Sequence, residues 1–192
     1  MPAWSTSWLW HTPAYPEMSA PGVAPPSDFL RAVEQRLSHG RVLDVACGSG
    51  RNALFFLARG DGVVGVDRSL DSLHQARGAA GDAARLRLIQ ADLEQWSLPA
   101  SAFDLVLNVR YLQRSLAPAL SRALRPGGML VFETFLVDQL QRGHPRNPDF
   151  VLQHNELLRL FPELRVLHYE EGLCRDGQGD AHLARLLAQR PG

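Results

Sequence analysis

The chain contains no lysine, and all 20 of its basic residues are arginine. This absence excludes Schiff-base chemistry, a lysine general base and a Walker A phosphate loop, because each of them needs a lysine amine. Twenty acidic residues balance the arginines, so the formal net charge is zero. Proteins that bind nucleic acid through bulk charge carry an excess of basic residues. We therefore predict no nucleic-acid partner.

Cysteines and long apolar runs are also scarce. Cys47 and Cys174 are the only cysteines, and the seven histidines form no H-x-H or H-E-x-x-H pair. Neither a disulfide framework nor a metal site is expected from such a set. No apolar stretch approaches the roughly 20 residues that cross a bilayer, and the first residues lack the basic start of a signal peptide. We expect a cytoplasmic protein with no membrane partner.

Composition divides the chain into two unequal parts. Residues 1–26 contain three tryptophans and six prolines. Proline opposes regular helix and strand, and tryptophan is costly to leave in water. We expect this segment to be irregular, either as a lid or interface element or as a disordered tail with an aromatic cluster. Residues 27–192, in a chain with 45% hydrophobic residues, are enough for a single domain with a sizeable core.

The most informative stretch runs from Val42 to Gly60, VLDVACGSGRNALFFLARG, and is followed by VVGVDRS. Its pattern predicts a buried strand, a glycine turn, a helix and a second buried strand. Gly48 and Gly50 let the backbone approach a ligand that a Cβ atom would exclude. Asp67 ends the second strand, where a carboxylate can accept hydrogen bonds from both ribose hydroxyls. A nucleotide-sized pocket is therefore expected.

Two classes of ligand use such a pocket. A pyrophosphate dinucleotide prefers the G-x-G-x-x-G turn, which is missing here, and Asp44 would lie close to its phosphates. A carboxylate in that place suits a ligand with a cationic ammonium or sulfonium group. S-adenosylmethionine is such a ligand, and we predict it as the cofactor. An NAD-dependent oxidoreductase is the alternative that the Asp44 loop opposes.

Apolar periodicity and turn residues predict the other elements. Further strands are expected over 86–90, 103–109, 129–135, 164–169 and 183–189, beside the first strand at 41–45. Helices are expected over 29–37, 51–59, 70–78, 117–124 and 153–160, the first of them capped by Ser27 or Asp28. A turn at 125–128, a flexible connector at 78–82 and an ordered loop at 136–149 join them.

These motifs together resemble the class I S-adenosylmethionine-dependent methyltransferases. Five elements occur in order over about residues 27–190: D-x-x-C-G-x-G-R-N, the acidic end of strand two, A-D-L, F-D-L-V and L-R-P-G-G. C-G-x-G-R-N and the E-T-F end of strand five are similar to bacterial tellurite-resistance-type methyltransferases, and PRNPDF, ELL and YEEG to their uncharacterised relatives. The resemblance implies an α/β, Rossmann-like, doubly wound seven-stranded sheet in the order 3-2-1-4-5-7-6, with the last strand antiparallel. We expect a small-molecule acceptor, because the acceptor elements are short and no RNA-binding or protein-binding domain is added, and we expect a monomer or homodimer.

In such a sheet the ligand lies at the carboxyl ends of the strands. The first strand and its turn are expected to hold the aminoacyl end of the cofactor, and Arg51 either pairs with its carboxylate or lies on the surface. Asp67 is expected at the ribose. Asp92 either accepts the adenine amine or caps a helix. The predicted cofactor-binding residues are Asp44, Ala46, Gly48, Ser49, Gly50, Arg51, Asp67, Arg68, Asp92, Leu93 and Asn108.

Methyl transfer from a sulfonium needs chiefly a well-positioned acceptor and the exclusion of water. A general base is required only where the acceptor holds its proton firmly. Arg110, Tyr111 and Glu133 are predicted to face the methyl group as catalytic residues. Arg110 or Arg146 can hold an anionic acceptor, and Glu133 or His144 can take a proton, although Glu133 can also serve as a structural hydrogen-bond acceptor. A protein that binds the cofactor as a sensor or partner, without methyl transfer, is the alternative function.

Overall fold

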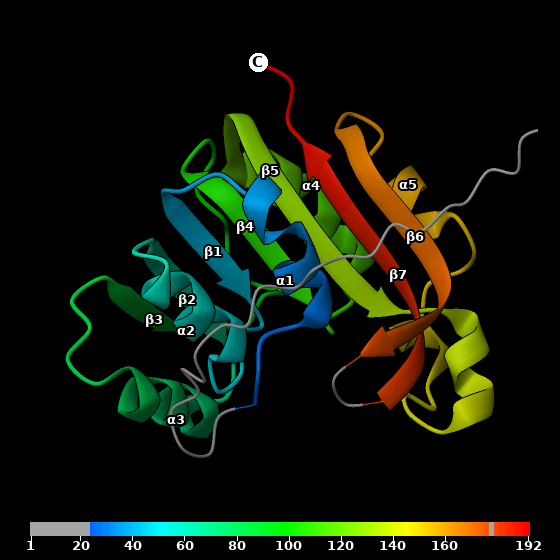
Figure 1. Cartoon of the computed structure of the whole chain (residues 1–192), viewed down its shortest axis with the longest axis horizontal. Helices are drawn as coiled ribbons and strands as arrows, with labels where there is room; N and C mark the ends of the chain where they lie inside the picture. Colours follow the sequence, from blue (N-terminus) through cyan, green and yellow to red (C-terminus); the bar gives the residue numbers. More distant parts are fainter. Residues whose placement is uncertain (1–23, 177–178) are drawn as a thin grey trace, which may run out of the picture.

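The computed structural model describes residues 24–176 and 179–192 as a seven-stranded sheet with helices on both faces (Figure 1). The strand order is β3-β2-β1-β4-β5-β7-β6, and β7 runs antiparallel to both of its neighbours. The predicted fold class, strand order and antiparallel last strand are confirmed. The predicted lid over residues 1–26 lies almost entirely outside the described residues.

The elements alternate between strand and helix in the first half of the chain. The strands are β1 Arg41–Val45, β2 Gly62–Asp67, β3 Leu86–Gln90, β4 Phe103–Val109, β5 Leu124–Phe135, β6 Arg165–Asp176 and β7 Gly179–Gln189. The α-helices are α1 Asp28–Val33, α2 Arg51–Ala58, α3 Leu70–Ala80, α4 Ala117–Ala123 and α5 Glu156–Leu160. Short 3-10 turns are η1 Glu34–Arg36, η2 Arg114–Leu116, η3 Val137–Arg142 and η4 Pro148–Phe150. In the described residues no helix has the length and hydropathy to cross a membrane.

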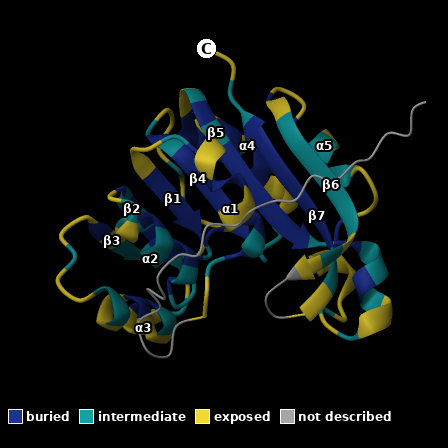
Figure 2. Cartoon of the chain, viewed as in Figure 1, coloured by how far each residue is buried: buried dark blue, intermediate teal, exposed yellow. Residues whose placement is uncertain are grey.

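The central strands are buried on both faces because side chains alternate between two hydrophobic clusters. On β1, Val42 belongs to the cluster under α1 and α2, whereas Leu43 and Val45 belong to the cluster under α4 and α5. Figure 2 shows β1, β4, β5 and β7 buried in the middle of the molecule and the outer connections exposed. This sandwich fixes the carboxyl ends of β1, β2, β4 and β5 along one edge, since these strands are parallel.

Several predicted boundaries differ from the observed ones. Ser27 is the cap of α1, because its hydroxyl accepts the Phe29 N–H at 3.2 Å, but the α-helix ends at Val33 and a 3-10 turn continues it. Helix α3 ends two residues later than predicted, at Ala80, and shortens the connector. Helix α5 begins at Glu156 rather than at residue 153, because Asn155 has a φ of 58° and interrupts the helical path.

The last hairpin is longer than predicted. Strands β6 and β7 pair from Arg165 with Gln189 to Asp176 with Gly179. The outer part of this hairpin carries charged residues, among them Glu170, Glu171 and Arg175, so it lacks the apolar alternation that predicts a strand. Hydrogen bonding to the neighbouring strand extends the sheet there all the same.

The predicted 125–128 turn is a bulge inside β5. Residues Phe103 and Leu105 of β4 pair with Leu124 and Met129, so four residues of β5 lie opposite a single residue of β4. A Cβ atom on Gly128 would lie 2.9 Å from the Arg125 carbonyl oxygen and 3.1 Å from the Phe103 carbonyl oxygen. Backbone atoms on both sides explain why glycine is needed here.

Gly128→Ala is expected to destabilise the protein by about 1–3 kcal/mol, the usual range for overpacking. The reason is that the new methyl group meets backbone oxygens, which cannot rotate away. Urea unfolding of the two proteins measures the difference. Gly62→Ala in β2 is the matched control, since a Cβ there meets no atom of the described residues within 4 Å, and equal stability of the two variants would contradict the prediction.

Candidate functional site

A cavity of about 490 Å³ opens at the carboxyl ends of the strands. Its volume lies in the roughly 300–1,000 Å³ range of small-molecule sites. Its walls come from the turns after β1, β2, β3 and β4, from the end of β5, and from the segment that follows β5. The position agrees with the rule that ligands of open α/β sheets bind beyond the strand ends.

Seven of the fourteen predicted site residues line this cavity: Ala46, Asp67, Arg68, Asp92, Leu93, Arg110 and Tyr111. The other seven do not line it: Asp44, Gly48, Ser49, Gly50, Arg51, Asn108 and Glu133. Most of the latter build the turn after β1, and Asn108 and Glu133 lie in β4 and β5.

The turn between β1 and α2 depends on a left-handed backbone. Ala46, Gly48 and Gly50 all have positive φ, at 52°, 53° and 85°. A Cβ atom on Gly48 would enter open space, whereas one on Gly50 would lie 2.9 Å from the Ala76 Cβ on α3. Gly50 therefore allows α2 and α3 to approach one another, and Gly48 leaves room for a ligand.

Asp67 supports this turn from the end of β2. One carboxylate oxygen accepts the Gly48 N–H at 2.8 Å, and the other accepts the Ser69 N–H at 2.8 Å. Each carboxylate oxygen has a second lone pair, so Asp67 can also accept hydrogen bonds from a ligand in the cavity that it lines. The sequence predicted the ligand contact but not the support of the turn.

Asp44 is a buried carboxylate at the end of β1. It is 1% exposed, and within the described residues its Oδ2 atom has no hydrogen-bond partner. Burial raises the pKa of Asp44 to about 7, although the Ala53 N–H and the Arg51 guanidinium act in the opposite direction. An unpaired buried carboxylate is costly, so a cationic group on a ligand would relieve it.

The pH dependence of stability should report this carboxyl group. Since the pKa of Asp44 is raised from 3.8 to about 7, the folded protein keeps a proton that the unfolded chain loses. The stabilising contribution of Asp44 is fully present below its unfolded-state pKa and is lost as the pH rises through its folded-state pKa. The free energy of unfolding should therefore fall by about 2–3 kcal/mol between about pH 5 and pH 8. Urea unfolding at both pH values should show this loss in the wild type and not in Asp44→Asn. The same change of unfolding free energy with pH in both proteins would contradict the prediction. Asp71→Asn, which removes an exposed carboxylate, is the control.

Tyr111 lies on the acidic side of the cavity. Burial, followed by the charges of Glu94 and Asp92, raises the pKa of its phenol, which therefore remains protonated at neutral pH. The hydroxyl donates to the Gln113 side chain at 2.7 Å. This geometry makes Tyr111 a hydrogen-bond donor rather than a base. The Asn108 amide donates to the Tyr111 carbonyl oxygen at 2.6 Å and holds the tip of β4.

Asp92 lies at the cavity and in the turn that follows β3. Its side chain lines the cavity, and its Oδ1 atom accepts the Glu94 N–H at 3.0 Å. The backbone carbonyl of Asp92 accepts the N–H groups of Gln95 and Trp96. The residue thus closes the turn after β3 and still faces the cavity.

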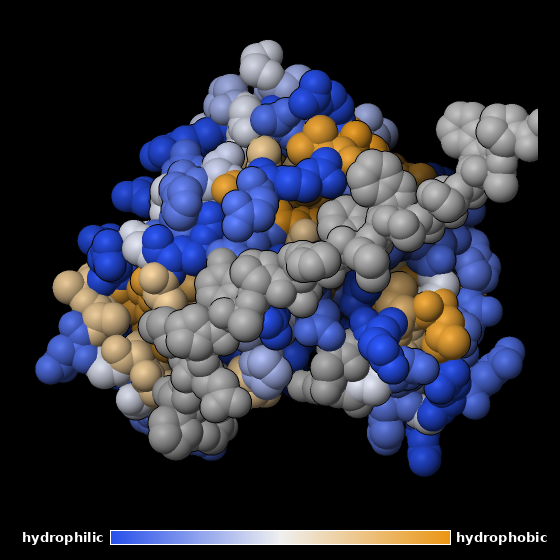
Figure 3. Space-filling view, viewed as in Figure 1, coloured by the Kyte–Doolittle hydropathy of each residue, from blue (hydrophilic) through white to orange (hydrophobic). Residues whose placement is uncertain are grey.

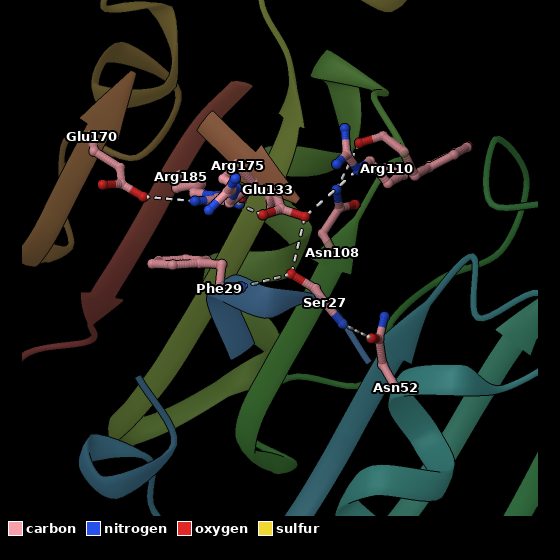
Figure 4. A network of polar contacts seen from close by, with 10 residues as sticks. Ser27, Phe29, Asn52, Asn108, Arg110, Glu133, Glu170, Arg175 and Arg185 are labelled. Atoms are coloured by element: carbon pink, nitrogen blue, oxygen red, sulfur yellow. Dashed lines mark hydrogen bonds and ion pairs between the residues drawn. The ribbon is translucent and has the colours of Figure 1, made fainter. Parts of the chain in front are cut away.

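Glu133 lies behind the cavity wall in a buried charge cluster (Figure 4). Its side chain is 0% exposed and contacts two guanidinium groups, that of Arg185 at 2.7 Å and that of Arg110 at 3.5 Å. The Ser27 hydroxyl donates to the same carboxylate at 3.1 Å. The structure thus shows the hydrogen-bonding role for Glu133 that the sequence left open.

Eight lining residues are outside the predicted set: Ala91, Glu94, Leu112, Gln113, Thr134, Phe135, Pro145 and Phe150. The segment after β5 was expected to fold over the site through His144 and Arg146, but Pro145 and Phe150 are the residues that line it. Both belong to PRNPDF, so the motif was the available signal. A periodic pattern does not show which side chains of a loop turn inward.

A doubly wound sheet with a glycine turn after β1 and a carboxylate at the end of β2 defines a nucleotide-type cofactor site. Residues 42–128 match the model of a methyltransferase domain. This match agrees with the class I S-adenosylmethionine-dependent methyltransferases that the motifs of the chain resemble.

Three known proteins illustrate the similarity. The malonyl-[acyl-carrier protein] O-methyltransferase of Enterobacter lignolyticus is 35% identical over 59% of this chain and 46% of its own length. The tRNA U34 carboxymethyltransferase of Methylococcus capsulatus is 36% identical over 53% of this chain and 34% of its own length. The structure of TehB from Haemophilus influenzae superposes with a TM-score of 0.72 and 20% identity, covering 85% of this chain and 61% of TehB.

These similarities differ in what they show. The chain spans less than half the length of the two curated relatives, whose names describe different acceptors. The TehB structure shows the fold, which is the fold that the tellurite-resistance-type motifs implied. The acceptor therefore has to be argued from the site of this chain.

Proposed function

We propose that this protein binds S-adenosylmethionine in the cavity and transfers its methyl group to a small-molecule acceptor. The observation that carries the proposal is the buried Asp44 carboxylate, whose Oδ2 atom has no hydrogen-bond partner in the described part of the chain. S-adenosylmethionine carries the ammonium and sulfonium cations that such a group favours. The same carboxylate disfavours the phosphates of a dinucleotide, so NAD is not proposed.

The residues around Asp44 divide the proposed cofactor between them. We assign the aminoacyl end to the turn of Ala46, Gly48, Ser49 and Gly50, where Ala46 lines the cavity, Asp44 is buried next to the turn and Arg51 starts α2. Asp67 takes the ribose, beside Arg68. Asp92 and Leu93 hold the adenine, since Leu93 is a buried apolar side chain in the cavity wall. Asn108 supports this side indirectly through Tyr111.

Bound S-adenosylmethionine supplies an activated methyl group, so the residues of this chain have mainly to position the acceptor and exclude water. Arg110 is suited to position the acceptor, because it lines the cavity and its planar guanidinium offers several hydrogen-bond donors. The Tyr111 hydroxyl stays protonated and donates to the Gln113 side chain. Glu133 holds Arg110 from behind and acts as a positioning residue rather than a base.

A small acceptor is favoured over tRNA by charge and volume. A surface with zero formal net charge offers little bulk attraction for a polyanion. A cavity of about 490 Å³ has the size of a small-molecule site. A cytoplasmic location and the monomer or homodimer remain predictions from the sequence.

The test is an assay for S-adenosylhomocysteine release with labelled S-adenosylmethionine and a panel of carboxylates, phenols, thiols, amines and oxyanions. Transfer of label to one of these classes supports the proposal. Transfer to tRNA alone contradicts the small acceptor. Cofactor binding without transfer to any acceptor class, in a correctly folded protein, favours a sensor or partner function.

A further inference from the structure

The two sides of the cavity differ in chemistry. Asp67, Asp92 and Glu94 come from the ends of β2 and β3, and the charges of all three act on the Tyr111 phenol. The opposite side comes from the end of β5 and the segment after it, which contribute the apolar side chains of Phe135, Pro145 and Phe150. The sheet order places β2 and β3 away from β5. The acidic side suits the cofactor, so the apolar side is left for the acceptor.

Phe150 is exposed at this apolar side and yet held in place. It is 55% exposed, which is unusual for a large apolar side chain among the described residues. The Arg114 guanidinium donates hydrogen bonds to the backbone on both sides of Phe150, to the Asp149 carbonyl at 2.9 Å and to the Val151 carbonyl at 2.8 Å. The Arg114 guanidinium also pairs with the Glu156 carboxylate at 2.5 Å. A fixed, exposed aromatic at a cavity is a ready contact for a ligand.

Other exposed apolar side chains do not share this setting. Leu70, Val166 and Leu173 are 47%, 46% and 57% exposed, and none of them lines the cavity. On the face seen in Figure 3, apolar side chains form small separate patches among hydrophilic ones. Single exposed apolar residues of that kind need no explanation. Leu173 therefore provides a control for Phe150.

A cation lies next to the apolar wall. The guanidinium of Arg110 stacks over the Phe135 ring, with 4.5 Å between Cζ and the ring centroid. Arg110 lines the cavity, and its guanidinium also contacts the Glu133 carboxylate at 3.5 Å. The Arg110 N–H donates to the Glu133 carbonyl at 2.7 Å, which fixes the backbone as well.

We propose that the acceptor is a small molecule with a flat apolar body and one anionic group. The body packs against Phe135, Pro145 and Phe150, and the anion faces Arg110. This inference rests on the proposed function, because it takes the acidic side of the cavity to be filled by the cofactor. Arg114 is a positioning residue in this scheme, since it acts through Phe150.

The experiment is a calorimetric titration of 2-naphthoate into the full chain saturated with S-adenosylhomocysteine. The neutral isostere 2-naphthamide and the small dianion malonate serve as comparison probes. We expect 2-naphthoate to bind at least about tenfold more tightly than either of them, since it alone combines the ring with the charge. If 2-naphthamide binds as tightly as 2-naphthoate, the acceptor needs no anionic group. If malonate binds more tightly than 2-naphthoate, the acceptor needs no apolar body.

Three variants locate the bound probe. Phe150→Ala is expected to weaken 2-naphthoate binding about fivefold, the scale of one lost aromatic contact. Leu173→Ala, with a similarly exposed side chain outside the cavity, should leave it unchanged. Arg110→Gln should remove the preference for 2-naphthoate over its amide. No change in Phe150→Ala overturns the proposed wall.

The two proposals fail in different ways. Absence of S-adenosylhomocysteine binding contradicts the proposed function, and the probes are then titrated without it to test the acceptor side alone. Binding of S-adenosylhomocysteine without any binding of 2-naphthoate overturns only the acceptor inference.

Discussion

Asp67→Ala is expected to raise the dissociation constant for S-adenosylmethionine by at least about thirtyfold. Hydrogen bonds to a charged group contribute roughly 1.5–3 kcal/mol each, and a factor of ten corresponds to about 1.4 kcal/mol. The variant loses the proposed ribose contacts. It also loses the 2.8 Å hydrogen bond from the Gly48 N–H that holds the turn after β1 in place. Calorimetric titration of the purified variant measures the change.

Two further variants separate these effects. Asp67→Asn keeps the shape and one carbonyl oxygen but loses the charge, so its affinity should lie between those of the wild type and Asp67→Ala. Asp71→Ala removes a nearby exposed carboxylate on α3 and should bind normally. An unchanged dissociation constant in a folded Asp67→Ala protein would contradict the assignment of Asp67 to the cofactor.

Arg185→Met is expected to give the largest loss of stability, about 3–5 kcal/mol, the range for breaking a buried ion pair. Glu133 is 0% exposed and lies 2.7 Å from Arg185, so the variant leaves a buried carboxylate without its nearest cation. Arg110, at 3.5 Å, and the Ser27 hydroxyl replace that cation only in part. Urea unfolding of both proteins measures the difference in the free energy of unfolding.

A surface ion pair provides the matched control. Arg125 is 46% exposed and lies 2.9 Å from Asp104, so Arg125→Met should cost less than about 1 kcal/mol. The double variant Glu133→Gln/Arg185→Met should be more stable than the sum of the single changes predicts, because the two groups contact one another. A cost for Arg185→Met no larger than that for Arg125→Met would show that the cluster does not stabilise the fold.

The fold could be predicted from the sequence where elements are apolar and periodic. β1, β3 and β4 were placed at their observed bounds, β1 and β4 because buried parallel strands are largely apolar and β3 because its apolar residues alternate with polar ones. The charged outer part of the β6–β7 hairpin carried no such pattern, and its strands were predicted too short. The start of α5 was missed because Asn155 adopts a left-handed backbone that helix propensity does not reveal.

The site was predictable to the extent that it depends on local motifs. Asp67, Arg68, Asp92 and Leu93 lie at the ends of strands or within three residues after them, and all of them line the cavity. Contacts between residues far apart in the sequence could not be predicted. Glu133 meets Arg185 across 52 residues of sequence and Ser27 across 106, and no spacing rule links them.

Calorimetric titration of the protein with S-adenosylmethionine, S-adenosylhomocysteine and NAD tests the central claim most directly. The buried Asp44 carboxylate, whose Oδ2 atom has no hydrogen-bond partner among the described residues, and the turn around Gly48 favour the first two ligands and oppose the phosphates of the third. Micromolar binding of S-adenosylmethionine and S-adenosylhomocysteine, without binding of NAD, is the predicted result. Binding of NAD, or of none of the three by a folded protein, would contradict the account.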